Sequence, residues 1–225
     1  MSVSEDHTVQ ASAPTVTPSG IADPAPLGLA AFALTTFLLS AKNANWMTHA
    51  SGDAFFGYAF AYGGLCQLLA GMWEFRNRNV FGATAFSTYG GFWIGVGIWF
   101  RFIAVPAITA ARTPAALAAA VTAINHDQGW ILLAFFIFNT YMLILSTQIN
   151  LAVFLVFLTL EITELILFIG FFEAGSSATN TGLVQTGGYV GILTALAAWY
   201  TSFALVSRGI AGGKLVFPVG DPLIK

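Results

Sequence analysis

Long apolar runs alternate with short polar links along most of this chain, from residue 27 to residue 206. Each run has about 18 to 23 residues, enough for a helix that rises 1.5 Å per residue to cross ~30 Å of hydrocarbon. A transmembrane β-strand would have ~10 residues that alternate between apolar and polar, and these runs do not alternate. The pattern therefore predicts six transmembrane helices, at 27–44, 53–75, 81–103, 130–147, 151–172 and 183–206.

The polar links indicate how these helices follow one another. FRNRNV, after the second helix, and TQIN, after the fourth, are short and predict antiparallel neighbours. The link at 104–129 is longer, and its segment PAALAAAV predicts a small surface helix. Six spans put both termini on one side of the membrane. That side carries five of the eight Lys and Arg residues, which predicts a multi-pass plasma-membrane protein with both termini in the cytoplasm.

The ends of the chain differ from its centre. Residues 1–22 are rich in Ser, Thr, Pro and acids, with no Lys or Arg and no apolar core. A signal peptide needs a basic start and an apolar core, so this segment is predicted to be a disordered cytoplasmic tail. Residues 23–207 form the predicted six-helix transmembrane domain, and residues 208–225 form a cytoplasmic C-terminal tail.

The composition supports insertion into a lipid bilayer. Hydrophobic residues make up 57% of the chain and charged residues 8%, against about 25% charged in a soluble domain. The net charge of −2, without a basic stripe, argues against a nucleic-acid partner. We find no zinc-ligand spacing and no nucleophile–base pair, so we expect no metal, no cofactor and no enzymatic activity. Cys66 is the single cysteine, which excludes an internal disulfide.

The first predicted helix has a rigid start, with Asp23 followed by Pro24 and Pro26. Proline fits the first turn of a helix, so the helix is expected to begin near Pro26 or Leu27. The unpartnered amides of that turn carry partial positive charge and would suit a carboxylate. Alternatively, Asp23 is the N-cap and its own side chain occupies those amides.

Four stretches carry a resemblance to a known family: DPAPLGL from residue 23, YGG from 62 with GMWEF from 71, FGATAFSTYGGFW from 81, and FPVGDP from 217. They resemble motifs of the acetate uptake transporters, the succinate–acetate permease family. The matches extend over residues 23–222. The family signature begins with Asn where this chain has Asp23, and a negative charge there would repel a carboxylate at the pore entrance.

The resemblance implies an all-α membrane protein with six transmembrane helices per protomer, assembled as a hexameric ring. It further implies a pore in each protomer for acetate and similar small monocarboxylates. A narrow apolar constriction would be formed by Phe32, Tyr89 and a leucine of the fifth helix. Counting back from Gly170 gives Leu160, and counting from the fourth helix allows Leu158 as an alternative. Such a ring would pass a two-carbon acid and resist bulkier ones, including succinate.

Further residues are expected to line the pore or its entrance. Thr36 is four residues from Phe32 and shares its helix face. Gln67 could donate to a substrate or tie two helices together. The full expected set is Pro24, Pro26, Leu27, Gly28, Thr36, Tyr62 and Gln67.

Two acids, Glu161 and Glu164, lie in the middle of the fifth predicted helix. An ionisable group inside a membrane is costly and is by default a candidate for function. Glu164 shares a face with Leu160, and Glu161 lies about 100° away around the helix. One hypothesis is that Glu164 carries the proton that accompanies the acid. The alternative is a structural role for both, with hydrogen bonds to a neighbouring helix or subunit.

Two other functions are compatible with the same sequence. A membrane sensor or adaptor could keep this fold without transporting anything, and residues 1–22 could then be its interaction element. An apolar pore would also suit neutral ammonia, so an exporter of ammonium or another small solute is a further alternative. The sequence leaves open whether the movement of acetate is passive or coupled to protons.

Overall fold

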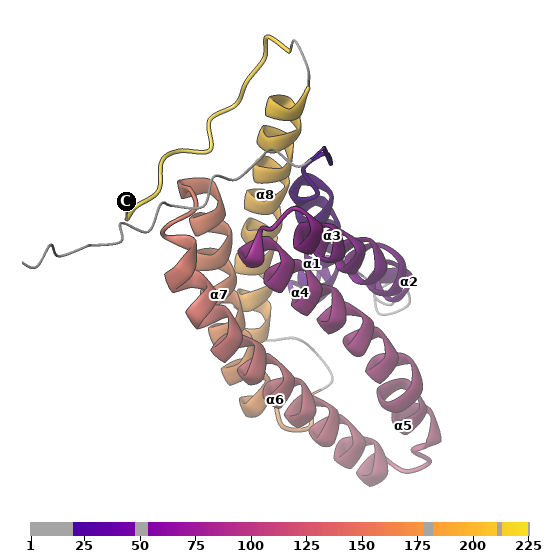
Figure 1. Ribbon diagram of the computed structural model, residues 1–225. Coiled ribbons are helices and arrows are strands. Elements are labelled where there is room, and N and C mark those ends of the chain that lie inside the picture. Colours follow the sequence, from indigo (N-terminus) through magenta and orange to yellow (C-terminus); the bar gives the residue numbers. More distant parts are fainter. Residues whose placement is uncertain (1–19, 48–53, 178–181, 211–212, 225) are drawn as a thin grey trace, which may run out of the picture.

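The computed structural model describes residues 20–47, 54–177, 182–210 and 213–224. Among these residues, six helices are long and apolar enough to cross a membrane, which confirms the six predicted spans. The elements are α1 (Ala25–Asn43), α2 (Phe55–Phe60), the π-helical η2 (Ala61–Cys66), α3 (Gln67–Arg76), α4 (Val80–Trp99), the π-helical η3 (Phe100–Ala104), α5 (Val105–Ala110), α6 (Pro114–Ser146), α7 (Leu151–Glu173) and α8 (Leu183–Gly209) (Figure 1). The second span combines α2, η2 and α3, and the third combines α4, η3 and α5.

The prediction of a separate surface helix around PAALAAAV was wrong. This segment forms the first turns of α6, a continuous helix of 33 residues. The helix starts at Pro114 because the Thr113 hydroxyl oxygen accepts a hydrogen bond from the Ala116 N–H at 3.1 Å. Gly129, near the predicted start of the span, lies inside α6 and faces the ring of Phe172. It serves helix packing and does not end a helix.

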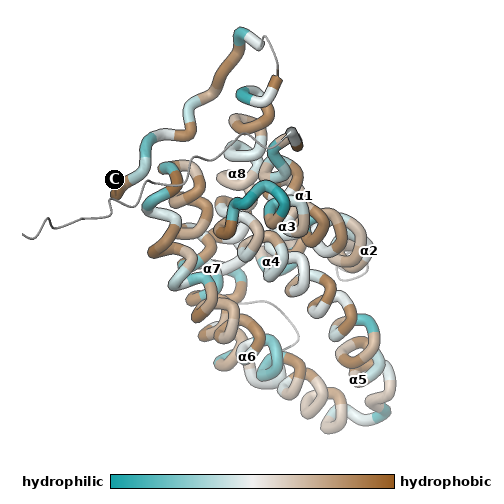
Figure 2. The backbone as a smooth tube through the Cα atoms, viewed as in Figure 1, coloured by the Kyte–Doolittle hydropathy of each residue, from teal (hydrophilic) through white to brown (hydrophobic). Residues whose placement is uncertain are grey.

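The helices pack in a chain of neighbours in which α1 contacts α8, α8 contacts α7 and α7 contacts α6, while α3 packs on α4 (Figure 1). Apolar residues cover all the spans, and hydrophilic residues gather at the turn between α3 and α4 (Figure 2). Large apolar side chains such as Ile137, Ile144 and Leu193 are exposed. That exposure fits a protein whose outer surface faces lipid rather than water.

The contact between α1 and α8 depends on glycine. A side chain at Gly188 would overlap the backbone of Ala44, and one at Gly191 would overlap the side chain of Ser40. Small residues allow helix backbones to approach closely where lipid supplies no hydrophobic driving force between helices. This close approach fixes α1, which carries Phe32 and Thr36, against the rest of the bundle.

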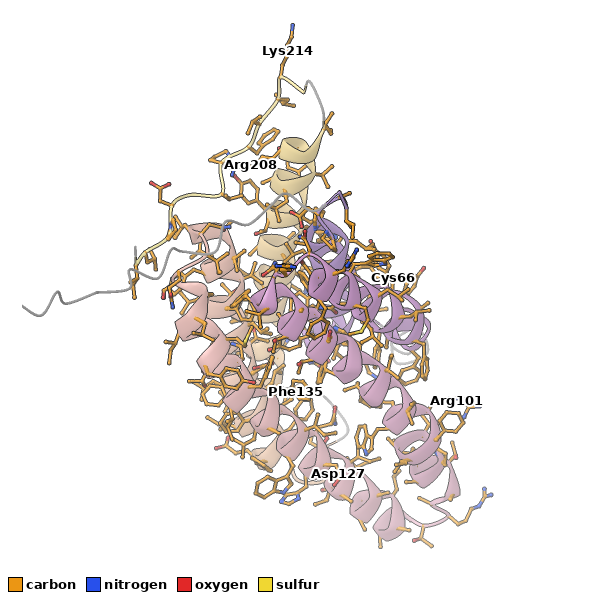
Figure 3. All side chains as sticks on the ribbon, viewed as in Figure 1. Cys66, Arg101, Asp127, Phe135, Arg208 and Lys214 are labelled. Carbon is orange, nitrogen blue, oxygen red and sulfur yellow. The ribbon has the colours of Figure 1, made fainter. Side chains whose placement is uncertain are left out.

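The C-terminal segment 213–224 folds back across one end of the bundle (Figure 1). The Val219 carbonyl accepts a hydrogen bond from the Ala152 N–H in the first turn of α7 at 2.8 Å, and the Leu223 N–H donates to the Thr147 carbonyl at 2.8 Å. The Val219 side chain is buried. Arg208 and Lys214 lie at this end, and Arg101 and Asp127 lie toward the opposite end (Figure 3).

Candidate transport pathway

Three cavities lie along the interior of the helix bundle. The first, of about 180 Å³, is called the entrance cavity; it is lined by Asp23, Asn79 and Asn150 and reaches Phe32, Tyr89 and Leu160. The second, of about 40 Å³, is called the middle chamber and contains Thr36 and Glu164. The third, of about 30 Å³, is called the far cavity and contains Gln128 and Phe171. Each volume exceeds the ~10–15 Å³ that a water molecule needs.

The entrance cavity lies where three helices begin. Asn79 is the N-cap of α4 and Asn150 is the N-cap of α7, and each side-chain oxygen accepts a backbone N–H of its own helix. At the start of α1, the Asp23 carboxylate accepts the Ala25 N–H at 2.9 Å. The N-terminal end of a helix carries partial positive charge. Most of the residues that line this cavity are apolar. Three helix ends with partial positive charge lie around it.

The prediction of Asp23 as the N-cap was wrong, because the N-cap is Pro24, but the Asp23 side chain does occupy one amide of the first turn. Its carboxylate binds an amide of the first turn of α1, and the residue is exposed and lines the entrance cavity. The helix begins at Ala25, slightly earlier than expected, with Pro24 as the N-cap.

Phe32, Tyr89 and Leu160 line both the entrance cavity and the middle chamber, so they stand between the two. The rings of Phe32 and Tyr89 meet edge to face, with centroids 5.6 Å apart. All three side chains are buried in one hydrophobic cluster. Leu158, the alternative leucine, lines none of the three cavities.

A second narrow place separates the middle chamber from the far cavity. The two spaces share the same five side chains, Leu39, Asn43, Phe92, Leu132 and Leu167. They come from α1, α4, α6 and α7. The sequence did not single out these residues, because each belongs to an ordinary apolar run or helix end.

The structure places several expected pore residues elsewhere. Pro24, Pro26, Leu27, Gly28 and Tyr62 line none of the three cavities. The cause is helical periodicity: Leu29, Phe32 and Thr36 follow one face of α1 at spacings of three and four residues.

The expected residues that line none of the cavities lie in other surroundings. Leu27 is 45% exposed on the outer surface, the Pro26 carbonyl accepts from the Ser202 hydroxyl of α8 at 2.6 Å, and Gly28 faces Phe86. Gln67 does line the entrance cavity, and its side-chain oxygen is buried without a partner in the described part of the chain.

A buried hydrogen-bond network surrounds Tyr89. Its hydroxyl lies 3.0 Å from Oδ1 of Asn139 and 3.4 Å from Oε1 of Glu164. The Asn139 amide donates to the Phe157 carbonyl at 3.0 Å and to Oε2 of Glu161 at 2.7 Å. Glu161 also accepts from the Thr140 hydroxyl at 2.6 Å. The network connects α4, α6 and α7 beside the constriction.

Two features separate the members of this network. Glu164 lines the middle chamber, whereas Glu161 lines none of the three cavities and faces α6 instead. Asn139 is fully buried, and the sequence analysis missed it. An asparagine inside the apolar run WILLAFFIFNTYMLIL is the signal that could have identified it, because polar residues inside spans are rare and usually face the interior.

Comparison with known proteins gives a consistent result. The model of the GPR1/FUN34/yaaH family matches residues 6–211. Acetate permease A of Emericella nidulans is 42% identical over an alignment of 191 residues, and the match covers 81% of this chain and 61% of that protein. The chain therefore spans about three fifths of that relative's length. Ammonia transport outward protein 2 of Saccharomyces cerevisiae is 33% identical, covering 89% of this chain and 67% of that protein.

A solved structure shares the fold. The structure of the bacterial acetate channel SatP superposes with a TM-score of 0.70 at 25% sequence identity, and the match covers 89% of this chain and 99% of that one. The all-helical arrangement described above is thus one that a known membrane channel also adopts.

Proposed function

This chain belongs to the GPR1/FUN34/yaaH family, and from that premise we propose that it moves acetate and similar small monocarboxylates across a membrane. The path runs from the entrance cavity past Phe32, Tyr89 and Leu160 into the middle chamber, and then into the far cavity. The observation that carries this proposal is the serial arrangement of three cavities divided by a narrow apolar ring. The family relatives named for acetate support the choice of substrate.

The chemistry of the path suits a small acid. Three helix N-termini around the entrance cavity attract an anion, although Asp23 reduces that attraction. The apolar ring then excludes acids with a bulkier or more polar body than acetate. A dicarboxylate such as succinate would have to desolvate a second carboxylate at the ring, which is costly.

The assembly and the location belong to the same proposal. We place the protein in the plasma membrane with both termini in the cytoplasm. We further propose that it is a homo-oligomer, assembled as a hexameric ring. Residues 23–207 are the proposed transmembrane domain and residues 208–225 a cytoplasmic C-terminal segment, while residues 1–19 of the predicted N-terminal tail lie outside the described residues. The positive-inside distribution of Lys and Arg supports the orientation.

Export of ammonia is the second candidate function, and a relative named for outward ammonia transport favours it. Neutral ammonia could pass an apolar ring as readily as acetic acid. The same path would then serve a base instead of an acid. A sensor that does not transport is the remaining alternative.

Purified protein in liposomes separates these functions. Labelled acetate and labelled methylammonium, an ammonium analogue, are supplied outside the liposomes with and without a proton gradient. If the protein transports acetate, labelled acetate enters faster than it enters protein-free liposomes. If the protein exports ammonia, labelled methylammonium enters faster instead, and if it is a sensor, neither does. A rate of acetate entry equal to that of empty liposomes would exclude the proposed function.

A further inference from the structure

Two residues that line the middle chamber each carry a buried polar atom without a hydrogen-bond partner in the described ranges: Oγ1 of Thr36 and Oε2 of Glu164. Thr36 is 6% exposed and Glu164 is 3% exposed. A buried polar atom without a partner is unfavourable, and a threonine inside a helix can normally bond back to a carbonyl of the preceding turn. Two such atoms on residues that line the same cavity indicate that a ligand completes their hydrogen bonds.

The neighbouring network determines which of these atoms can donate. The Phe157 carbonyl can only accept, so the Asn139 amide nitrogen must face it. The Asn139 oxygen then faces Tyr89, and because that oxygen can only accept, the single hydrogen of the Tyr89 hydroxyl points to it at 3.0 Å. Tyr89 therefore has no hydrogen left for Glu164.

With its hydrogen on Asn139, the Tyr89 oxygen, 3.4 Å from Oε1 of Glu164, can only accept a hydrogen there. Protonation of Glu164 at Oε1 supplies it, and the Tyr89 oxygen accepts. The second oxygen, Oε2, is left in the middle chamber as a pure acceptor. The ionisable groups near this pair are Glu161 on α7 and Tyr141 on α6, the latter acting on Tyr89.

We propose that the middle chamber is a binding site for one small monocarboxylic acid in its protonated, neutral form, recognised by Glu164 and Thr36. The O–H of the acid donates to Oε2 of Glu164, and the Thr36 hydroxyl donates to the acid's carbonyl oxygen. No covalent bond changes, and the total charge stays the same. A carboxylate has no hydrogen to offer Oε2, so the site disfavours the anion.

This inference rests on the proposed function for the identity of the ligand. If acetate crosses as the neutral acid, each molecule brings one proton with it, and the charge on Glu164 does not change. The role of Glu164 therefore differs from that of a proton carrier. It selects the protonated substrate, as a specificity-determining residue of the pathway.

Equilibrium binding tests the inference separately from transport. Labelled acetate is titrated against the purified full chain in detergent between pH 4.5 and 7. For the wild type, the apparent affinity falls with rising pH in proportion to the fraction of neutral acid. If the protein binds acetate in this way but moves none in liposomes, the proposed function fails and the inference stands.

Substitution of Glu164 distinguishes the two roles of this residue. Glu164→Gln can donate an N–H to Tyr89 and present its carbonyl oxygen to the chamber, so it should keep both the affinity and the pH profile. Glu164→Leu and Thr36→Val should each weaken binding of the neutral acid by about tenfold, equivalent to ~1.4 kcal/mol. Glu161→Gln is the matched control on the same helix, outside the chamber, and should bind like the wild type.

Three results would overturn the inference. Loss of binding or of the pH profile in Glu164→Gln would show that the carboxyl itself must exchange a proton. Wild-type affinity in both Glu164→Leu and Thr36→Val would remove the site. A wild-type affinity that does not depend on pH would show that the anion binds as well as the acid. Thermal unfolding of each variant in detergent establishes that the protein compared is folded.

Discussion

Phe32 of α1 and Tyr89 of α4 meet edge to face, with ring centroids 5.6 Å apart and ring planes inclined at 67°. This geometry is favourable for two aromatic rings, so each ring holds the other in place. Because Asn139 also fixes the Tyr89 hydroxyl at 3.0 Å, two sides of the narrow ring are rigid. Leu160, on α7, is the aliphatic third side.

Leu160→Ala is therefore the change that widens the ring without disturbing the aromatic pair. We expect uptake of lactate and succinate to rise relative to acetate, on the order of tenfold, since each methylene in an apolar pocket changes discrimination by ~1–3 kcal/mol. Competition between labelled acetate and the unlabelled longer acids measures this. Leu158→Ala, two residues away and outside all three cavities, should keep the original preference. Equal selectivity in the two variants would contradict the assignment of Leu160.

Tyr89→Phe keeps the ring and removes the hydroxyl. Oδ1 of Asn139 and the carboxyl of Glu164 then lose their shared partner while still buried. The free energy of unfolding should fall by about 1–3 kcal/mol, and discrimination between acetate and lactate should persist because the aromatic edge remains. Thermal unfolding in detergent and uptake in liposomes report the two effects. An unfolding midpoint equal to that of the wild type would argue against the network.

Asn139→Ala removes the amide that donates to Phe157 and Glu161 and accepts from Tyr89. We expect a loss of stability of a few kcal/mol together with a change in acid selectivity, because the Tyr89 ring loses its anchor. Asn125→Ala is the matched control on the same helix.

The Asn125 amide donates to the carbonyls of Gly175 and Ser177, at 2.9 and 3.1 Å. Its replacement should lower stability and leave selectivity unchanged. If both variants change selectivity equally, Asn139 has no special role at the constriction.

Asp23→Asn keeps an oxygen that can accept the Ala25 N–H and removes the negative charge from the entrance cavity. The KM for acetate should fall by a few-fold at low salt, and the difference from the wild type should shrink at high salt because exposed charges are screened. Asp23→Ala also removes the charge but loses the hydrogen bond to the Ala25 N–H, at a cost of about 0.5–2 kcal/mol. A KM for Asp23→Asn that equals the wild-type value at every salt concentration would mean that the charge does not act on the substrate.

Gly220→Ala tests the attachment of the C-terminal segment. Gly220 has φ +73°, and a Cβ there would lie 2.6 Å from Cβ of Leu151. We expect the segment to detach, so that the amides of Leu223 and Ile224, which donate to Thr147, exchange their hydrogens faster.

Gly175→Ala is its control. That glycine also has positive φ, +53°, but no atom lies within 4 Å of its added Cβ. The substitution there costs only the ~1–2 kcal/mol of placing an alanine in the left-handed region. Hydrogen exchange at the Leu223 amide should not become faster. Protection of Leu223 equal to that of the wild type in Gly220→Ala would show that the segment tolerates the displacement.

Several residues of the proposed pathway were named from the sequence. Phe32, Tyr89 and Leu160 were expected at the constriction because the motifs around them resemble a known family, and the cavities meet at these side chains. Thr36 followed from its spacing of four residues from Phe32, which places both on one helix face. Pro24, Pro26 and Leu27 line none of the three cavities, because proximity in sequence to Phe32 does not determine which side of α1 a residue occupies.

By itself, the sequence determined that the chain crosses a membrane six times, because the length and hydrophobicity of a span are local properties of consecutive residues. It also predicted the start of α1 to within two residues, at Pro26 or Leu27 against Ala25, since proline acts on its own backbone. Only the tertiary structure decided that Asn139 lies beside Tyr89, 50 residues away in sequence, and that Glu164 faces the middle chamber while Glu161 faces α6. Those relations depend on how helices rotate and pack against one another, and no single segment of the chain contains that information.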